Sequence, residues 1–190
     1  GAQWSGITTR IAERLLETGA VDAVLTMTAD PDDRWRPVPV LVTQAKDMAA
    51  CRGMRMGYAP LLSLLEPARE RGFKRLAVIG IPCQVYALRA LEQELGFERL
   101  FVIGTPCSDN TTTERFHEFL ALLTDRPETI TYLEFRADYH VEIRFADGSR
   151  RCVPFCSRMR LLERCASSRA SASICSAGVL WMAMGFFCSG

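Results

Sequence analysis

The chain contains Lys74-Arg-Leu-Ala-Val-Ile-Gly-Ile-Pro-Cys83 and, 24 residues later, Glu98-Arg-Leu-Phe-Val-Ile-Gly-Thr-Pro-Cys107. Each stretch has the apolar run of a buried strand and ends in Gly-x-Pro-Cys. The residues between them, from Gln84 to Leu95, have the pattern of a helix. A strand, a helix and a second strand predict two parallel strands joined by a right-handed crossover. Both Pro-Cys turns should therefore leave the same carboxyl edge of a sheet, where open α/β folds bind ligands.

Upstream of this unit, helical and extended patterns alternate. The first helix has apolar residues at helical spacing and ends at Gly19, which suits a left-handed cap. Pro67 lies inside a later helical pattern, where it bends the helix or starts a new first turn. Thr43 is expected to cap a helix that runs to about Cys51. The expected elements are helices over 7–16, 43–51 and 61–71 and strands over 23–27 and 38–42.

Downstream of this unit, the period of the apolar residues changes from helical to alternating. Thr111 and Glu114 form a capping-box pattern ahead of a helical stripe. Beyond Pro127 apolar residues alternate with others, and Asp147-Gly148 supplies a hairpin turn. We therefore predict an α/β protein, a parallel-sheet βαβ core with an antiparallel β extension.

Composition and charge argue against several classes of protein. The 190 residues include 23 Lys and Arg against 22 Asp and Glu, and no basic stripe indicates nucleic-acid binding. No apolar stretch reaches the roughly 18 residues that a transmembrane helix needs. The first residues lack the basic start and apolar core of a secretory signal. They also lack an initiator Met, which suggests a fragment whose beginning lies upstream.

Cysteine usage indicates a reducing compartment, so we expect a cytoplasmic protein. The eight cysteines are not spaced like a small disulfide scaffold, which favours metal or redox use. Five of them lie in the last 39 residues, within a mixture of Ser, Ala and Arg and without C-x-x-C spacing. We interpret residues 156–190 as a non-native or out-of-frame tail and residues 1–155 as one domain.

Cys83 and Cys107 are the candidate metal ligands. Soft thiolates suit iron–sulfur centres, and two of them on rigid turns at one sheet edge suggest such chemistry. In the alternative interpretation both are small buried apolar residues, a common fate of cysteine. A cluster usually needs four ligands, so these two do not complete one.

Three further features are candidates for contact with a cofactor. The glycine-rich stretch from Gly1 to Gly6 leads into a helix whose first N–H groups could bind the phosphates of a dinucleotide, although it could equally be an ordinary turn. Gln84 and the turn Ser108-Asp109-Asn110 are expected at the same edge as the cysteines, where they contact the cofactor or cap helices. His117 and His140 have no partner in a recognisable motif and are not assigned as bases.

These motifs resemble the family of the coenzyme F(420)-reducing hydrogenase and formate dehydrogenase beta subunits. The likeness covers about residues 1–155. It is carried by the glycine-rich opening, by Gly80-Ile-Pro-Cys83-Gln84 and by Gly104-Thr-Pro-Cys107. It looks closest to a photosynthetic branch, the ferredoxin-dependent 8-vinyl reductases of divinyl (proto)chlorophyllide and the 7-hydroxymethyl chlorophyll a reductases. The segments that carry this narrower likeness are 30–34, 37–41, 104–110 and 132–139.

The resemblance implies an iron–sulfur flavoprotein that holds FAD and 4Fe-4S clusters. Electrons from reduced ferredoxin would reach a tetrapyrrole and convert its vinyl group to ethyl. Cys83 and, less directly, Cys107 would be cluster ligands. Proteins of this family also carry a cysteine-rich segment before the glycine-rich start and a C-x-x-C segment after the last strand, which this sequence does not show. The residues that would contact FAD are Gly1, Gln3, Trp4, Ser5, Gly6, Thr8, Thr9, Gln84, Ser108 and Asn110.

Other functions stay open at this point. Within the family, the chain could be part of a deazaflavin-dependent hydrogenase or dehydrogenase beta subunit. A cofactor-free α/β binding module is an alternative of another class, and it predicts a colourless protein. A thiol-nucleophile enzyme is a further option, but the sequence offers no base for it.

Overall fold

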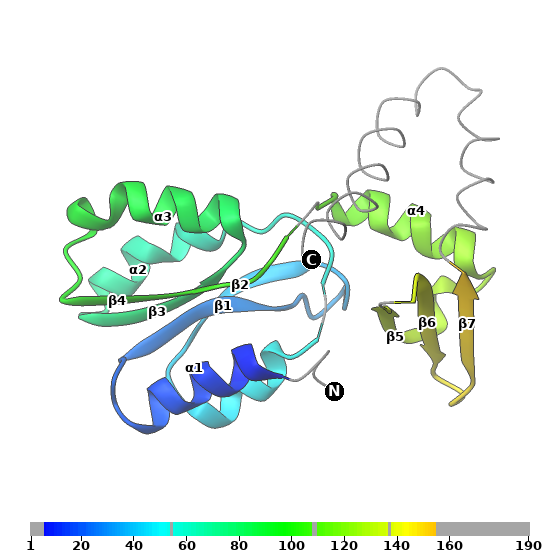
Figure 1. Cartoon of the computed structure of the whole chain (residues 1–190), viewed down its shortest axis with the longest axis horizontal. Coiled ribbons are helices and arrows are strands. Elements are labelled where there is room, and N and C mark those ends of the chain that lie inside the picture. Colours follow the sequence, from blue (N-terminus) through cyan, green and yellow to red (C-terminus); the bar gives the residue numbers. More distant parts are fainter. Residues whose placement is uncertain (1–5, 54, 108–109, 137, 155–190) are drawn as a thin grey trace, which may run out of the picture. The chain divides into compact units, whose positions relative to one another are not determined.

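The computed structural model describes residues 6–53, 55–107, 110–136 and 138–154 (Figure 1). The chain forms two compact units, Gly1–Cys107 and Ser108–Gly190. Among the described residues, no helix has the length and apolar character needed to cross a membrane.

The first unit is built on a four-stranded sheet. Its strands are β1 (Ala23–Ala29), β2 (Pro37–Val42), β3 (Arg75–Gly80) and β4 (Arg99–Gly104), in the order β2-β1-β3-β4. β3 is parallel to both β1 and β4, while β2 pairs with β1 in the antiparallel direction. The predicted parallel βαβ unit is therefore confirmed, and β1 extends the parallel sheet by one strand.

Helical segments cover both faces of this sheet (Figure 1). α1 (Ile7–Glu17) and the 3₁₀ segment η1 (Ala45–Cys51) lie on one face, and η2 (Leu61–Leu64), α2 (Leu65–Glu70) and α3 (Pro82–Leu95) lie on the other. Strands covered on both faces read as continuous apolar runs. Six residues of β1 and β3 are accordingly almost fully buried: Ala23, Val24, Leu25, Leu76, Ala77 and Val78.

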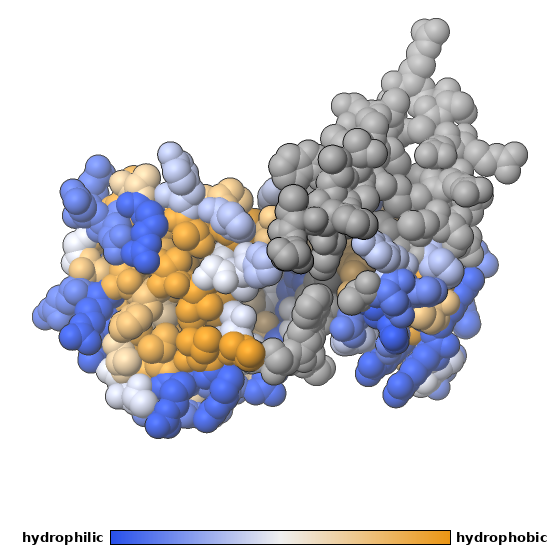
Figure 2. Space-filling view, viewed as in Figure 1, coloured by the Kyte–Doolittle hydropathy of each residue, from blue (hydrophilic) through white to orange (hydrophobic). Residues whose placement is uncertain are grey.

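The edge strand β4 is less covered than its neighbours. Its apolar residues Leu100 to Ile103 are only half buried. Alternate residues pack toward the two helical layers, Leu100 and Val102 to one and Phe101 and Ile103 to the other. Figure 2 shows apolar side chains gathered along the middle of the first unit, between more polar helix surfaces.

Local structure agrees with several sequence expectations and corrects others. Gly19 follows α1 in the left-handed region with φ of 62°, as expected. Pro67 lies in the first turn of α2, after the short helix η2, so it starts a helix rather than bending one. The segment ending at Cys51 is a 3₁₀ helix with Gln44 at its N-cap, so Thr43 does not cap it. This segment is too short and irregular for sequence periodicity to distinguish the two helix types.

The described part of the second unit consists of one α-helix, a 3₁₀ turn and a three-stranded antiparallel sheet. α4 (Thr113–Leu123) is followed by η3 (Pro127–Thr129), and the strands are β5 (Ile130–Phe135), β6 (His140–Phe145) and β7 (Arg150–Pro154). The sheet order is β5-β6-β7, which confirms the predicted antiparallel extension. α4 packs on this sheet, and the rings of its Phe119 and of Phe135 in β5 stack 5.9 Å apart.

Turn and cap residues set the limits of these elements. Gly148 has φ of 82° in the β6–β7 hairpin, which confirms the predicted turn. The N-cap of α4 is Thr112, whose hydroxyl accepts a hydrogen bond from the N–H of Arg115 at 3.3 Å. The predicted cap at Thr111 was therefore wrong by one residue, because three consecutive threonines offer the same side chain.

Candidate functional site

The two Gly-x-Pro-Cys turns leave the first sheet from paired positions. Gly80 and Gly104 lie opposite each other at the ends of β3 and β4. The N–H and hydroxyl of Thr105 both donate to the carbonyl of Gly80, at 2.9 and 3.2 Å. The chain after β4 is thus held beside the start of α3, and the prediction of a shared carboxyl edge is confirmed.

The two cysteines differ in exposure. Cys83 lies in the first turn of α3 and is exposed to solvent, so for Cys83 the alternative of a buried apolar residue is wrong. Cys107 follows β4 and is half buried. No disulfide links the four cysteines that the structure describes, which include Cys51 and Cys152. An exposed thiol on a helix start is available to a metal or to an electrophile.

A complete metal site is not formed by the described part of the chain. Within it, no group of three or more His, Cys, Asp or Glu side chains could hold a metal ion. Cys83 and Cys107 supply at most two of the four thiolates of an iron–sulfur cluster. The described residues alone therefore do not fit a cluster, and further ligands would have to come from outside them.

Gln84 is held in place by two backbone groups. Its side-chain oxygen accepts a hydrogen bond from the N–H of Ile81 at 3.1 Å, and its side-chain nitrogen donates to the carbonyl of Ala59 at 3.4 Å. The first contact satisfies an N–H group at the start of α3 that has no partner inside the helix. The second joins α3 to the segment before η2. These contacts correspond to the capping alternative for Gln84.

We expect Gln84→Ala to lower the free energy of unfolding by about 1 kcal/mol, because the Ile81 N–H loses its acceptor. Gln84→Glu is the matched control, since a carboxylate can accept the same bond at a helix start. Urea denaturation of the three proteins measures the difference. Equal stability of Gln84→Ala and the unmodified chain would show that the cap contributes nothing.

The start of α1 has the features of an anion site. Gly6 is its N-cap in the left-handed region with φ of 69°, and no side chain caps the helix there. The first turn, which includes Thr8 and Thr9, contains no acidic residue. Backbone N–H groups at such a start, together with the helix dipole, favour a phosphate or carboxylate.

The other predicted cofactor contacts are not placed at the carboxyl edge by the structure. Asn110 belongs to the second unit, where its side-chain oxygen accepts a hydrogen bond from the N–H of Thr111 at 2.9 Å. The remaining candidates lie outside the described residues: Gly1, Gln3, Trp4, Ser5 and Ser108.

Both helix starts lie at one edge of the first sheet. α1 leads through a tight turn into β1 and so begins near the carboxyl end of that strand, while α3 begins directly after β3 (Figure 1). A side chain at Gly104 would meet no other atom within 4 Å, and Gly104 is not among the glycines with positive φ. Neither packing nor backbone conformation requires glycine there, so the position leaves room for a ligand. The edge therefore fits the phosphates of a dinucleotide.

The sequence patterns did not predict that residues 50–53 and 55 border this edge. Thr28, near the end of β1, donates through its hydroxyl to the carbonyl of Ala50 at 3.3 Å. Arg52 pairs with Glu13 of α1 at 2.6 Å. Burial raises the pKa of the Cys51 thiol, which therefore stays neutral. The available signal was the succession of Arg and Gly residues from Arg52 to Gly57.

Two family models match this chain. The first is coenzyme F420 hydrogenase/dehydrogenase, beta subunit N-term, over residues 1–66. The second is the C-terminal model of the same family, over residues 73–178. The second match extends beyond residue 155, where the sequence analysis placed the start of a tail. That tail lies outside the described residues, and the interpretation of it stays a prediction.

Curated relatives have related names and are longer than this chain. The 7-hydroxymethyl chlorophyll a reductase, chloroplastic, of Oryza sativa subsp. japonica is 43% identical over 155 residues, which are 82% of this chain and 33% of that protein. One of the subunits of the F(420)H(2) dehydrogenase of Methanosarcina mazei is 33% identical over 93 residues, which are 49% of this chain and 26% of that protein. This chain thus spans about a third of the length of these relatives or less.

The fold also has a counterpart among solved structures. A chain of the F420-reducing [NiFe] hydrogenase complex from Methanosarcina barkeri, in a xenon-derivatised form, superposes with a TM-score of 0.71. The match covers 84% of this chain and 57% of that chain at 23% sequence identity, so it supports the fold alone. The two curated relatives are named as a reductase and a dehydrogenase. Together with the two family matches, these findings show that the chain belongs to the oxidoreductase family of the coenzyme F420 hydrogenase/dehydrogenase beta subunits.

Proposed function

We propose that this chain is the flavin-binding part of an iron–sulfur oxidoreductase that reduces a chlorophyll precursor with electrons from ferredoxin. The observation that carries the proposal is the carboxyl edge of the first sheet, where paired Gly-x-Pro-Cys turns and two helix starts come together. The 43% identity to a 7-hydroxymethyl chlorophyll a reductase supports a tetrapyrrole as the substrate. The reaction we propose adds two electrons and two protons to the 8-vinyl group of divinyl (proto)chlorophyllide.

In this proposal the first unit binds FAD through its phosphates. The N–H groups of the first turn of α1, around Thr8 and Thr9, bind phosphate oxygens, and Gly104 allows the ligand to approach the strand end. Bound flavin would supply the conversion of single electrons into the pair that a C=C reduction requires. The chain itself orients the ligand between rigid strand ends. Residues 1–5 remain candidates for the same contact.

Cys83 and Cys107 are proposed as thiolate ligands of an iron–sulfur cluster. Support comes from their positions after paired strand ends and from the exposure of Cys83. The other ligands would come from outside the described residues. Ferredoxin as electron donor and a reducing, cytoplasmic compartment complete the proposal. The rice relative carries the word chloroplastic in its name.

A second candidate function is that of a deazaflavin-dependent dehydrogenase or hydrogenase subunit. It is favoured by the names of the archaeal relatives, several of which contain coenzyme F420 or F(420). The two candidates differ in the acceptor and share the site at the sheet edge. The identity to these relatives is lower and covers about half of the chain.

Anaerobic reconstitution with FAD, iron and sulfide followed by a visible spectrum tests the proposal. We expect flavin absorption and a broad iron–sulfur shoulder, and then formation of the ethyl product from divinyl chlorophyllide with reduced ferredoxin. Oxidation of reduced deazaflavin without any pigment reduction would favour the second candidate. A colourless protein that binds neither flavin nor iron would contradict both and agree with a binding module.

A further inference from the structure

Arg55 has an unusual set of hydrogen bonds. Its two terminal nitrogens donate to backbone carbonyls of its own segment, to Arg52 at 3.2 Å, to Gly53 at 3.3 Å and to Ala50 at 3.4 Å. Its Nε is buried and has no hydrogen-bond partner. It is the one buried side-chain nitrogen or oxygen in the described part of the chain that lacks a partner.

Such an arrangement is costly for a guanidinium group. Arginine stays protonated in proteins, so burial cannot be relieved by loss of the proton. A buried N–H without an acceptor costs about 1–3 kcal/mol, and more when the group is charged. An unsatisfied group of this kind in a native protein calls for an explanation, for which a ligand is one of the few possibilities.

No negative charge within the described residues compensates Arg55. None of the ion pairs of the described chain includes it, whereas Arg52 is paired with Glu13 at 2.6 Å. The one titratable group that acts on its pKa is Cys51, a thiol whose own pKa is raised by burial. Burial also lowers the pKa of Arg55, the direction expected for a cation without a counter-ion.

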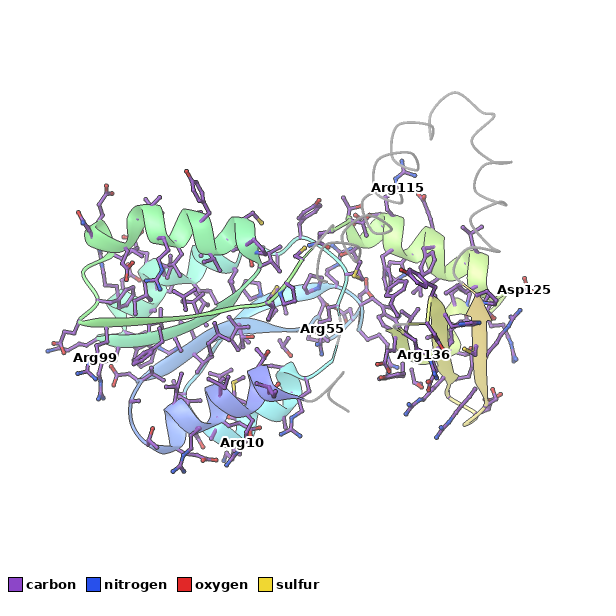
Figure 3. The ribbon with its side chains drawn as sticks, viewed as in Figure 1. Arg10, Arg55, Arg99, Arg115, Asp125 and Arg136 are labelled. Carbon is purple, nitrogen blue, oxygen red and sulfur yellow. The ribbon has the colours of Figure 1, made fainter. Side chains whose placement is uncertain are left out.

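The contacts of Arg55 place it at the ligand-binding edge. It shares the carbonyl of Ala50 with the hydroxyl of Thr28, which lies near the carboxyl end of β1. Figure 3 shows Arg55 in the segment that passes this end of the sheet, toward the start of α1. Its present hydrogen bonds are long, so turning the side chain toward a ligand gives up little.

We propose that Arg55 is a ligand for a phosphate-type anion at this edge. Resting on the proposed function, the anion is the diphosphate of FAD. Guanidinium groups bind phosphate through two parallel N–H···O bonds, for which Nε and one terminal nitrogen provide the donors. Nε thereby gains the acceptor it lacks, and the charge of Arg55 gains its counter-ion. Arg55 adds a positive side-chain charge to the backbone N–H groups that the start of α1 offers.

The test compares Arg55→Gln with Arg52→Gln in the full chain. Both variants remove one positive charge from the same segment, but the charge of Arg52 is already paired with Glu13. Calorimetry at low salt measures the affinity for inorganic pyrophosphate, FAD and riboflavin, which has no phosphate. We expect Arg55→Gln to lower the affinities for pyrophosphate and FAD about tenfold or more and to leave the affinity for riboflavin unchanged. Arg52→Gln should change none of these three affinities by more than about twofold.

A further variant shows whether a loss of affinity comes from a loss of folding. Arg55→Lys keeps the charge but lacks Nε and the planar fork, so we expect an intermediate loss of pyrophosphate affinity at an unchanged unfolding midpoint. If Arg55→Gln unfolds, the Arg55→Lys variant and the salt dependence of pyrophosphate binding decide the question. Pyrophosphate affinity that is the same in Arg55→Lys and the unmodified chain would then overturn the inference.

The outcomes also separate this inference from the proposed function. If Arg55→Gln binds FAD as tightly as the unmodified chain does, the flavin proposal stays intact and the role of Arg55 is overturned. If the chain binds no FAD but binds pyrophosphate in a way that depends on Arg55, the result supports an anion site for a free phosphate and contradicts the flavin proposal. An unmodified chain that binds neither ligand overturns both.

Discussion

Replacing Cys83 with serine is expected to reduce the iron retained after anaerobic reconstitution by at least about half, without destabilising the fold. A serine hydroxyl is a hard and weakly acidic ligand, whereas iron–sulfur clusters are held by thiolates. Cys83 is exposed in the first turn of α3, so its replacement leaves no buried hydroxyl and no cavity. Exposed substitutions of this kind change the free energy of unfolding by less than about 0.5 kcal/mol.

Cys152→Ser is the matched control for this result. Cys152 is also exposed, but it lies on β7 of the second unit and was not predicted to bind metal. Iron and acid-labile sulfide are quantified in both variants, together with the unfolding midpoint. Equal iron retention in Cys83→Ser and Cys152→Ser would contradict the ligand role of Cys83. A loss of stability of about 1–3 kcal/mol in Cys83→Ser would instead indicate a thiol that is packed in the folded chain.

The carboxyl edge was predictable because the signals that define it are local and repeated. Each apolar run before Gly80 and Gly104 marks a strand with apolar residues on both faces, and the intervening helix makes the strands parallel. A duplicated motif then forces corresponding residues to corresponding positions of the sheet. For this reason the sequence predicted the shared edge of the two Pro-Cys turns without any knowledge of side-chain packing.

The contacts that surround the edge were not predictable in the same way. Gln84 bonds to the carbonyl of Ala59, which is 25 residues away, and Thr28 bonds to the carbonyl of Ala50, which is 22 residues away. Nothing in the local pattern of either segment indicates its partner. The burial of the Nε of half-buried Arg55 also depends on its contacts with Ala50, Arg52 and Gly53, and an arginine in a glycine-containing stretch usually indicates a solvated loop.

The boundary between the two units was also hidden from sequence patterns. Ser108-Asp109-Asn110 looked like a polar turn belonging to the site, because such residues favour strand ends and helix caps. Contacts place the boundary between the two units at Cys107 and Ser108, next to the turn that was expected to serve the site. A polar turn and a domain junction have the same composition, and only the contacts of the complete fold distinguish them.

Asp22→Ala is expected to lower the free energy of unfolding by about 2 kcal/mol. One carboxylate oxygen of Asp22 accepts hydrogen bonds from the backbone N–H groups of Lys74 and Arg75, at 2.9 and 2.8 Å. The other accepts from Nε and Nη2 of the Arg75 side chain, at 3.1 and 2.5 Å. These bonds join the start of β1 to the start of β3 at the amino edge of the sheet, opposite the candidate site. Ligand binding should therefore survive the substitution.

The same carboxylate makes stability depend on pH in the acid range. Hydrogen bonds from the Arg75 side chain, opposed by burial and aided by the two backbone N–H groups, lower the pKa of Asp22 from 3.8 to about 2. A lowered pKa means that the folded state favours the ionised form, so its contribution is complete above the pKa of the unfolded chain. It is lost as the pH falls from about 4 through 2. Because the Arg75 side chain is 41% exposed, we discount the full linkage value to about 1–2 kcal/mol.

Asp22→Asn isolates this contribution, because the amide keeps one oxygen acceptor but cannot ionise. We expect the difference in unfolding free energy between the unmodified chain and Asp22→Asn to be about 1–2 kcal/mol at pH 6 and about a third of that near pH 2.5. Urea denaturation across this range measures it. A difference that stays constant as the solution is acidified would mean that the charge of Asp22 does not hold the two strands together. In that case the loss in Asp22→Asn would come from the hydrogen-bond acceptor that the amide removes, not from the charge of the carboxylate.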